Sequence, residues 1–154
     1  MRIAGHGLSI DAPQGWEARI FRRDGAAPVL HVATLALRER DGDFGAAATG
    51  RMRPDDVFAA LIEYRSDAMV RPGVGLFSIM GAPGTLEAHD FGSAQLQVTR
   101  TGQLGCQRFF TDLERPFCLY AVIRPASKRP ELLAKELSDV LVTLELHLRT
   151  GPAA

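Results

Sequence analysis

The residues of this chain with the most reactive side chains are four histidines and two cysteines, and the histidine spacing does not suit a metal site. The histidines are His6, His31, His89 and His147. No pair has the HxH or HExxH spacing that presents two imidazoles to one metal ion, so we expect neither a metal nor another cofactor. His89 and Asp90 are adjacent and could form a general-base pair, although a solvated loop explains them more simply.

His31 is the histidine that we expect to be buried. It lies in an apolar run at residues 28–37, where an imidazole more often forms a hydrogen bond inside the core than binds a ligand. A buried imidazole is nevertheless a titratable group whose pKa burial can shift, and such groups gather at functional sites. We therefore keep His31 as a candidate binding residue.

The two cysteines, Cys106 and Cys118, flank a predicted hairpin. A nucleophilic thiol needs an activating base and an electropositive setting, and Arg108 is close in sequence but no histidine is. A disulfide is possible only in some strand registers, and thiols stay reduced in the cytoplasm. We expect two buried residues that behave as small hydrophobes.

Phosphate-binding and nucleophile motifs are missing from the sequence. The glycines at residues 5–7 and 73–75 lack the GxGxxG and GxxxxGK[ST] spacings that cradle phosphates. Residues 5–9 also lack the GxSxG spacing of a nucleophile elbow. The adjacent carboxylates Asp55 and Asp56 are explained by a helix start, where the helix dipole favours negative charge.

The composition predicts one globular domain spanning residues 1–154. A chain of 154 residues fits a single core, and 46% apolar and 23% charged residues argue against disorder. Lys and Arg number 18, as do Asp and Glu, and no basic face outweighs its acidic neighbours, so we expect no nucleic-acid partner. No apolar run reaches the ~20 residues that span a bilayer, so we expect no membrane association.

The basic residues and the first residues of the chain bear on its source and location. All basic residues are arginine except Lys128 and Lys135, and asparagine is absent, which indicates the codon bias of a high-GC bacterial genome. Residues 1–11 lack the charged and apolar regions of a secretory signal, so we expect a cytoplasmic protein.

The hydrophobic pattern predicts an α+β fold, with an antiparallel sheet of about six strands packed by two main helices. The expected strands are residues 7–11, 16–22, 28–37, 94–99, 103–111 and 116–124. A proline-glycine turn at residues 12–15 predicts that the first two strands form a hairpin. A proline with two carboxylates at residues 54–56 predicts the first helix, and Pro130 begins the second, which runs to Leu144.

Three segments are expected to be less regular. Residues 1–5 and 150–154 are expected to be frayed at the ends, and the glycine-rich residues 41–50 to form a mobile loop. Residues 76–80 fit either an edge strand or a buried loop, and periodicity does not decide between them.

Two segments of the chain resemble PsbP-like domains. They are GLSIDAPQGWEARIF at residues 7–21, and FFTDLERPFCLYAVI at residues 109–123 with the amphipathic helix that follows. PsbP is the extrinsic photosystem protein that shares its fold with a Ran-binding nuclear import factor. The resemblance implies an α/β/α sandwich around an antiparallel sheet and a non-catalytic protein that works by binding. It transfers neither photosynthesis nor any Ran- or metal-contacting residue to this chain.

Three functional hypotheses remain. The first is a non-enzymatic interaction or assembly module of a bacterial cytoplasmic system. It docks another protein, or a second copy, through one face of the sheet and the apolar surface around Leu76, Phe77 and Met80. The second is a small-molecule-binding protein or cofactor-independent enzyme with a pocket between sheet and helices, to which Trp16, His31, Arg108 and Tyr120 contribute. The third is a thiol-dependent enzyme that uses one of the cysteines.

Overall fold

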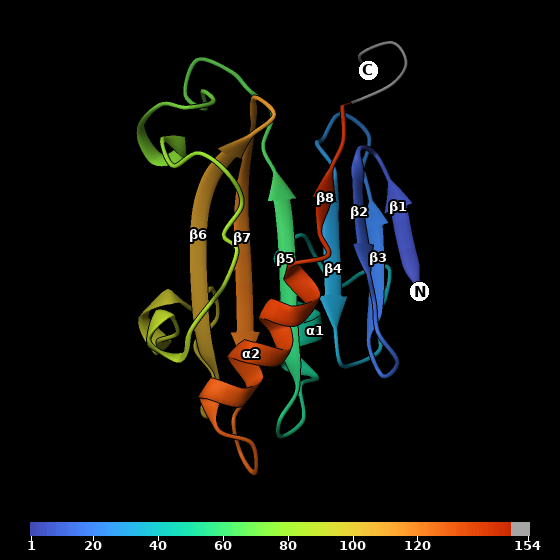
Figure 1. The fold of residues 1–154 in the computed structure, drawn as a ribbon, viewed down its shortest axis with the longest axis vertical. Helices are drawn as coiled ribbons and strands as arrows, with labels where there is room; N and C mark the ends of the chain where they lie inside the picture. Colours follow the sequence, from blue (N-terminus) through green and yellow to red (C-terminus); the bar gives the residue numbers. More distant parts are fainter. Residues whose placement is uncertain (149–154) are drawn as a thin grey trace.

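The computed structural model describes residues 1–148 and shows an α+β fold with two antiparallel sheets (Figure 1). The five-stranded sheet has the order β3 (Glu17–Phe21), β4 (Val29–Ala33), β5 (Val57–Glu63), β7 (Arg115–Ile123), β6 (Leu104–Asp112). The three-stranded sheet has the order β1 (Arg2–Gly5), β2 (Leu8–Asp11), β8 (Glu145–Leu146). The helices are α1 (Ala46–Gly50) and α2 (Pro130–Leu141). The predicted fold class is confirmed, but the single sheet of about six strands is replaced by two sheets.

One face of the five-stranded sheet packs against α2 and the three-stranded sheet (Figure 1). The residues of α2 in this core are Leu133, Ala134, Leu137, Val140 and Leu141, which recur at helical spacing. They meet Leu8 and Ile10 of β2 and alternate residues of the central strands, such as Leu119 of β7. The apolar stripe predicted for the second helix is therefore confirmed from Leu133 to Leu141. The helix ends at Leu141, not at Leu144 as predicted, and Leu144 packs against this core from beyond the helix.

The opposite face of the five-stranded sheet is covered by α1 and the residues on either side of it. Phe58, Tyr120 and Val122 point to this face and pack with Ala48 of α1. Gly45 precedes α1 with a φ of 69°, and a Cβ there would lie 2.1 Å from the Phe58 ring. Only glycine permits both that backbone conformation and that close approach.

The β6–β7 hairpin confirms two of the predicted strands to within one residue at each end. Cys106 lies opposite Ala121, and Cys118 lies opposite Phe109. Positions 106 and 109 are three residues apart, an odd number, so the two cysteines point to opposite faces of the sheet, and both are free. Phe109 and Phe110 also point to opposite faces, and this chain covers both: Phe110 stacks on Phe117, while Phe109 meets the ring of Phe77.

The first predicted helix is wrong, because its residues form β5. This strand lies between β4 and β7 and is buried along its whole length. A strand apolar on both faces shows no alternation, so its sequence fits a helical stripe as well. The apparent helix start is a turn: Asp55 has a φ of 69°, and its carboxylate accepts hydrogen bonds from the backbone N–H groups of Ala126, Ser127 and Lys128.

The first predicted hairpin is also wrong. β2 pairs with β1 and β8 in one sheet, whereas β3 pairs with β4 in the other, so the turn at residues 12–15 connects two sheets. Residues 2–5, which we expected to be frayed, form β1. The N-terminal ammonium of Met1 donates a hydrogen bond to the Ala12 carbonyl, which fixes that end of the strand.

Several irregular segments differ from expectation. Residues 94–99 form no strand; a 3-10 helix at Ser93–Gln95 (η3) begins this stretch. Residues 41–50, expected to be a mobile loop, include α1 and the buried Asp41. Residues 76–80 overlap a 3-10 helix at Gly75–Phe77 (η1), and Met80 forms a parallel bridge to Thr111 at the edge of β6. The frayed end predicted at residues 150–154 lies outside the described residues.

Within residues 1–148, no helix combines the length and the apolar character needed to cross a bilayer.

Candidate functional site

A groove of about 900 Å³ lies between α2 and the segment at residues 84–89. We call this hollow the α2 groove. Its apolar lining includes the buried Leu86, the half-buried Leu104 and the exposed Val142 just after α2. Its charged rim consists of Glu87, His89, Glu131, Lys135 and Asp139. An apolar surface bordered by charged side chains is typical of a binding groove.

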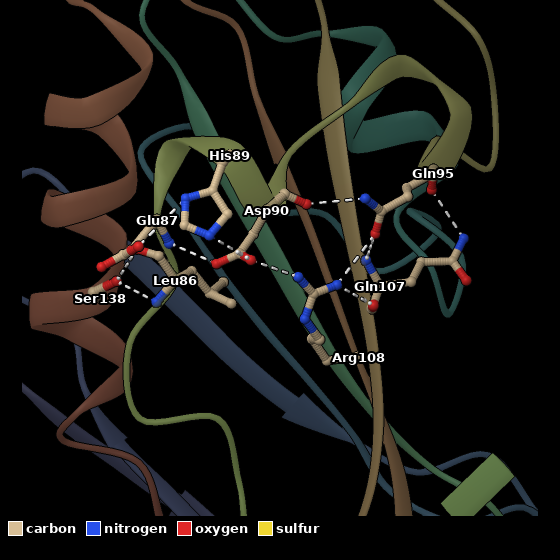
Figure 2. A network of polar contacts seen from close by, with 8 residues as sticks. All are labelled: Leu86, Glu87, His89, Asp90, Gln95, Gln107, Arg108 and Ser138. Atoms are coloured by element: carbon tan, nitrogen blue, oxygen red, sulfur yellow. Dashed lines mark hydrogen bonds and ion pairs between the residues drawn. The ribbon is translucent and has the colours of Figure 1, made fainter.

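Ser138 holds the irregular wall of the α2 groove against the helix. The backbone N–H of Leu86 donates to Ser138 Oγ at 2.9 Å, and the hydroxyl donates to the Leu86 carbonyl at 3.0 Å (Figure 2). Ser138 is buried on the inner face of α2. Buried backbone groups must be hydrogen-bonded, and here one side-chain hydroxyl bonds both the N–H and the carbonyl of Leu86, as a neighbouring strand would.

Asp90 organises the short 3-10 helix Ala88–Asp90 (η2) that ends this wall. Its Oδ2 accepts a hydrogen bond from the backbone N–H of Glu87 at 2.8 Å, which completes a capping box. Its Oδ1 lies 2.8 Å from Arg108 Nη2. The hydrogen bond from the Glu87 N–H, together with the bond and charge of Arg108, lowers the pKa of Asp90 below its usual range.

Arg108 extends this network to the outer edge of β6. Its Nη1 donates to the Gln107 carbonyl at 2.8 Å and reaches Gln95 Oε1 at 3.3 Å (Figure 2). The same Gln95 Oε1 accepts from the Gln107 backbone N–H at 2.9 Å, while Gln95 Nε2 donates to the Asp90 carbonyl at 2.9 Å. The wall of the groove is therefore fixed both to α2 and to the sheet, so the groove is preformed.

His89 lies on the rim of the α2 groove and is 76% exposed. Its Nδ1 lies 3.3 Å from Glu87 Oε2, and its Nε2 lies 3.6 Å from Asp90 Oδ1. Asp90 is already bonded to the Glu87 N–H and to Arg108, so it serves the fold of the wall. The Ser138 hydroxyl is likewise bonded to Leu86. The arrangement suits binding better than nucleophilic catalysis.

The predicted apolar surface near Leu76 lies outside the α2 groove. Leu76 and Met80 are 62% and 68% exposed, whereas Phe77 is buried against Tyr64 and Phe109. Together with Met69, Val74 and Ile79, the exposed Leu76 and Met80 form what we call the 69–80 patch. The patch belongs to the long irregular segment between β5 and β6, which then descends past β6 to the groove (Figure 1).

The remaining predicted site residues are dispersed. Trp16 lines a separate hollow of about 370 Å³ that includes Val140 of α2. His31 is fully buried on the opposite face of the sheet, and its Nε2 lies 2.8 Å from the Asp43 carbonyl. The Tyr120 hydroxyl accepts a hydrogen bond from the Gln97 N–H at 2.8 Å, and burial raises the pKa of Tyr120. Arg108, described above, is the one predicted site residue that supports the α2 groove.

Sequence reasoning missed Leu86, Glu87, Gln95 and Ser138 as site residues. The one local signal was the three-residue spacing of Glu87 and Asp90, which is typical of a helix cap. Ser138 lies 52 positions from Leu86, so no local pattern predicts their contact.

Among residues 1–148, no three or more His, Cys, Asp or Glu side chains are grouped so that they could hold a metal ion. Comparison with known proteins finds no matching family model, no matching curated protein and no matching solved structure. The function is therefore argued from the geometry of the α2 groove.

Proposed function

We propose that this protein is a non-enzymatic binding module that docks a segment of another protein in the α2 groove. The observation that carries the proposal is a preformed groove with an apolar lining and an acidic rim. Because the Ser138 and Arg108 contacts already fix its wall, a partner does not have to order that wall when it binds.

The charges of the rim define the partner segment. Glu87, Glu131 and Asp139 supply three carboxylates, whereas Lys135 supplies one ammonium group, which also lies 2.9 Å from Asp139. The rim is therefore net acidic when His89 is neutral. An apolar segment flanked by Lys or Arg complements both the lining and the rim, and opposite charges speed and orient such encounters.

The exposure of the rim favours a peptide over an enclosed ligand. Glu87, His89, Lys135 and Asp139 are all more than half exposed, so the groove is open along its rim. Small-molecule sites bury most of the ligand surface, whereas a helix or extended peptide can lie in an open groove. The groove volume of about 900 Å³ nevertheless lies in the range of ligand pockets, so a small-molecule-binding protein or cofactor-independent enzyme is the second candidate.

The proposal agrees with the binding role that a PsbP-like fold implies. We propose that fold on the two resembling segments alone. Another protein is the partner that we propose, and a second copy of this chain is an alternative that the oligomeric state tests.

Titration of the 15N-labelled protein with a Leu/Lys amphipathic helical peptide tests the proposal, with a Leu/Glu peptide of the same pattern as the control. We expect the Leu/Lys peptide to shift the amide resonances of Leu86, Ala88 and Val142, and the Leu/Glu peptide to bind at least about tenfold more weakly. Shifts confined to the 69–80 patch, or equal binding of both peptides, would contradict docking in the α2 groove.

A further inference from the structure

Another hollow, of about 460 Å³, lies beside the end of β3, and it is rich in arginine. We propose that this arginine pocket binds a phosphate monoester. The arginines that line it are Arg19, Arg22, Arg23 and Arg40, and the other lining residues are Phe21, Glu39, Gly42 and Asp43. The pocket belongs to the sheet face that carries His31 and Phe58, so it lies across the sheet from α2.

The charge of the arginine pocket favours a dianion. Four guanidinium groups face two carboxylates, those of Glu39 and Asp43, which leaves an excess of two positive charges. Arg23 forms an ion pair with Asp43. Among the residues that the structure describes, Arg19, Arg22 and Arg40 form no ion pair with a carboxylate. Their charges are therefore available to an anionic ligand.

Arg19 supplies the most specific feature of the pocket. Its Nη1 atom is buried and has no hydrogen-bond partner among the described residues. Because Nη1 is buried, a ligand in the pocket meets Arg19 through the rest of its guanidinium group. A phosphate is a suitable ligand, because the planar guanidinium group matches the geometry of a phosphate.

Rigid aromatic neighbours hold Arg19 in position. The Arg19 guanidinium carbon lies 5.5 Å from the centroid of the Phe21 ring. His31, directly across from Arg19 in the β3–β4 pair, packs edge-on against Phe21 with the ring centroids 5.1 Å apart. The His31 imidazole is fully buried and is held by its contact with the Asp43 carbonyl. The base of the pocket is thus built before any ligand binds.

The Phe21 ring and the pocket volume argue for an organic phosphate over a bare phosphate ion. Phe21 gives the pocket an apolar wall beside the arginines. A volume of about 460 Å³ holds a small organic group in addition to the phosphate. A phosphate monoester carries close to two negative charges at neutral pH, which matches the charge excess of the lining.

Isothermal titration calorimetry at low ionic strength tests the proposal with three probes: phenyl phosphate, benzoate and inorganic phosphate. Phenyl phosphate is expected to bind with one-to-one stoichiometry and at least about tenfold more tightly than either other probe, since only it has both the dianion and the ring. Absence of saturable binding of phenyl phosphate would overturn the proposal. Equal affinity for inorganic phosphate would overturn the assignment of a monoester.

Three variants locate the binding. Arg40→Ala removes an exposed arginine of the pocket, and Arg38→Ala removes an exposed arginine of the same loop that does not line it. We expect Arg40→Ala to weaken phenyl phosphate binding about tenfold and Arg38→Ala to change it by less than about twofold. Arg19→Gln is expected to weaken it at least as much as Arg40→Ala. An equal loss in Arg38→Ala and Arg40→Ala would show nonspecific attraction and overturn the site.

The arginine pocket and the α2 groove are tested separately. Arg40 does not line the groove, and Val142 does not line the pocket. A failure of phenyl phosphate to bind would therefore not contradict peptide docking in the groove, and a failure of peptide docking would not contradict the arginine pocket.

Discussion

Arg115 Nη2 lies 2.7 Å from Glu63 Oε1, and the two side chains are only 10% and 5% exposed. The same guanidinium group donates hydrogen bonds to the carbonyls of Gly7 and His147, at 3.2 and 3.1 Å. Arg115 begins β7, Glu63 ends β5, and Gly7 lies in the turn between β1 and β2. One buried arginine therefore joins the two sheets at this end of the fold.

Arg115→Met should lower the free energy of unfolding by about 3–5 kcal/mol, because it breaks a buried ion pair and removes the donor that binds the Gly7 and His147 carbonyls. Urea denaturation followed by circular dichroism measures the change. Lys128→Met is the control, since Lys128 pairs with Glu136 at the surface, and it should cost less than about 1 kcal/mol. Equal losses in the two variants would show that Arg115 does not join the sheets energetically.

Ser138→Ala should loosen the wall of the α2 groove. Without the hydroxyl, the Leu86 N–H and carbonyl lose their buried partner, at a cost of about 1–3 kcal/mol. Hydrogen exchange should then show faster exchange of the Leu86 amide than in the wild type. Ser127→Ala removes an exposed hydroxyl and should leave that amide unchanged. Unaltered Leu86 exchange in Ser138→Ala would contradict the proposed anchoring.

His31 should make the fold less stable in mild acid. Burial lowers the pKa of His31 below the ordinary value of 6.5, so the folded protein favours the neutral imidazole. Below about pH 6.5 the unfolded chain binds more protons than the folded chain at this site, and the free energy of unfolding falls as the pH falls, by up to about 1.4 kcal/mol per pH unit. Above that pH the contribution of His31 is fully present.

Urea denaturation at several values between about pH 5 and 7.5 measures this dependence. His31→Gln keeps an N–H donor for the Asp43 carbonyl but does not titrate, so its slope should be flatter than that of the wild type. An unchanged slope would show that His31 is not the group responsible.

Both cysteines should resist alkylation in the folded protein. Burial raises the pKa of Cys106 to about 11 and that of Cys118 to about 12, so almost no thiolate exists at neutral pH. Iodoacetamide should therefore label neither thiol until urea unfolds the chain, as mass spectrometry can show. Rapid labelling of either thiol in the native state would instead support the thiol-dependent enzyme.

The sequence predicts the elements whose patterns are local. The β6–β7 hairpin alternates in apolar faces, and α2 begins at Pro130 with a helical stripe, so both were predicted. β5 was missed because neighbours on both sides and both faces bury every residue, which removes the alternation. Asp55 reinforced the error, because a carboxylate after a proline is typical of a helix start. In the structure its carboxylate instead accepts hydrogen bonds from three N–H groups of a distant loop.

The candidate site was harder to predict than the fold. Arg108 was predicted as a polar contact of a pocket between sheet and helices, whereas the structure shows it bonded to Asp90 and Gln107. The α2 groove itself depends on contacts between residues far apart in sequence, such as Leu86 with Ser138. Such contacts depend on how the elements pack. Residues 84–90 have no helical or strand periodicity from which the Leu86–Ser138 contact could be predicted.

The docking proposal is tested most directly by selecting peptides from a random display library on the wild-type protein and measuring their affinity for two matched variants. Val142→Lys places a charge in the α2 groove, whereas Val74→Lys places one in the 69–80 patch, and both valines are exposed. We expect selected peptides to combine apolar and basic residues, to bind Val142→Lys at least about tenfold more weakly, and to bind Val74→Lys normally. Peptides that lose affinity only for Val74→Lys, or for neither variant, would contradict docking in the α2 groove.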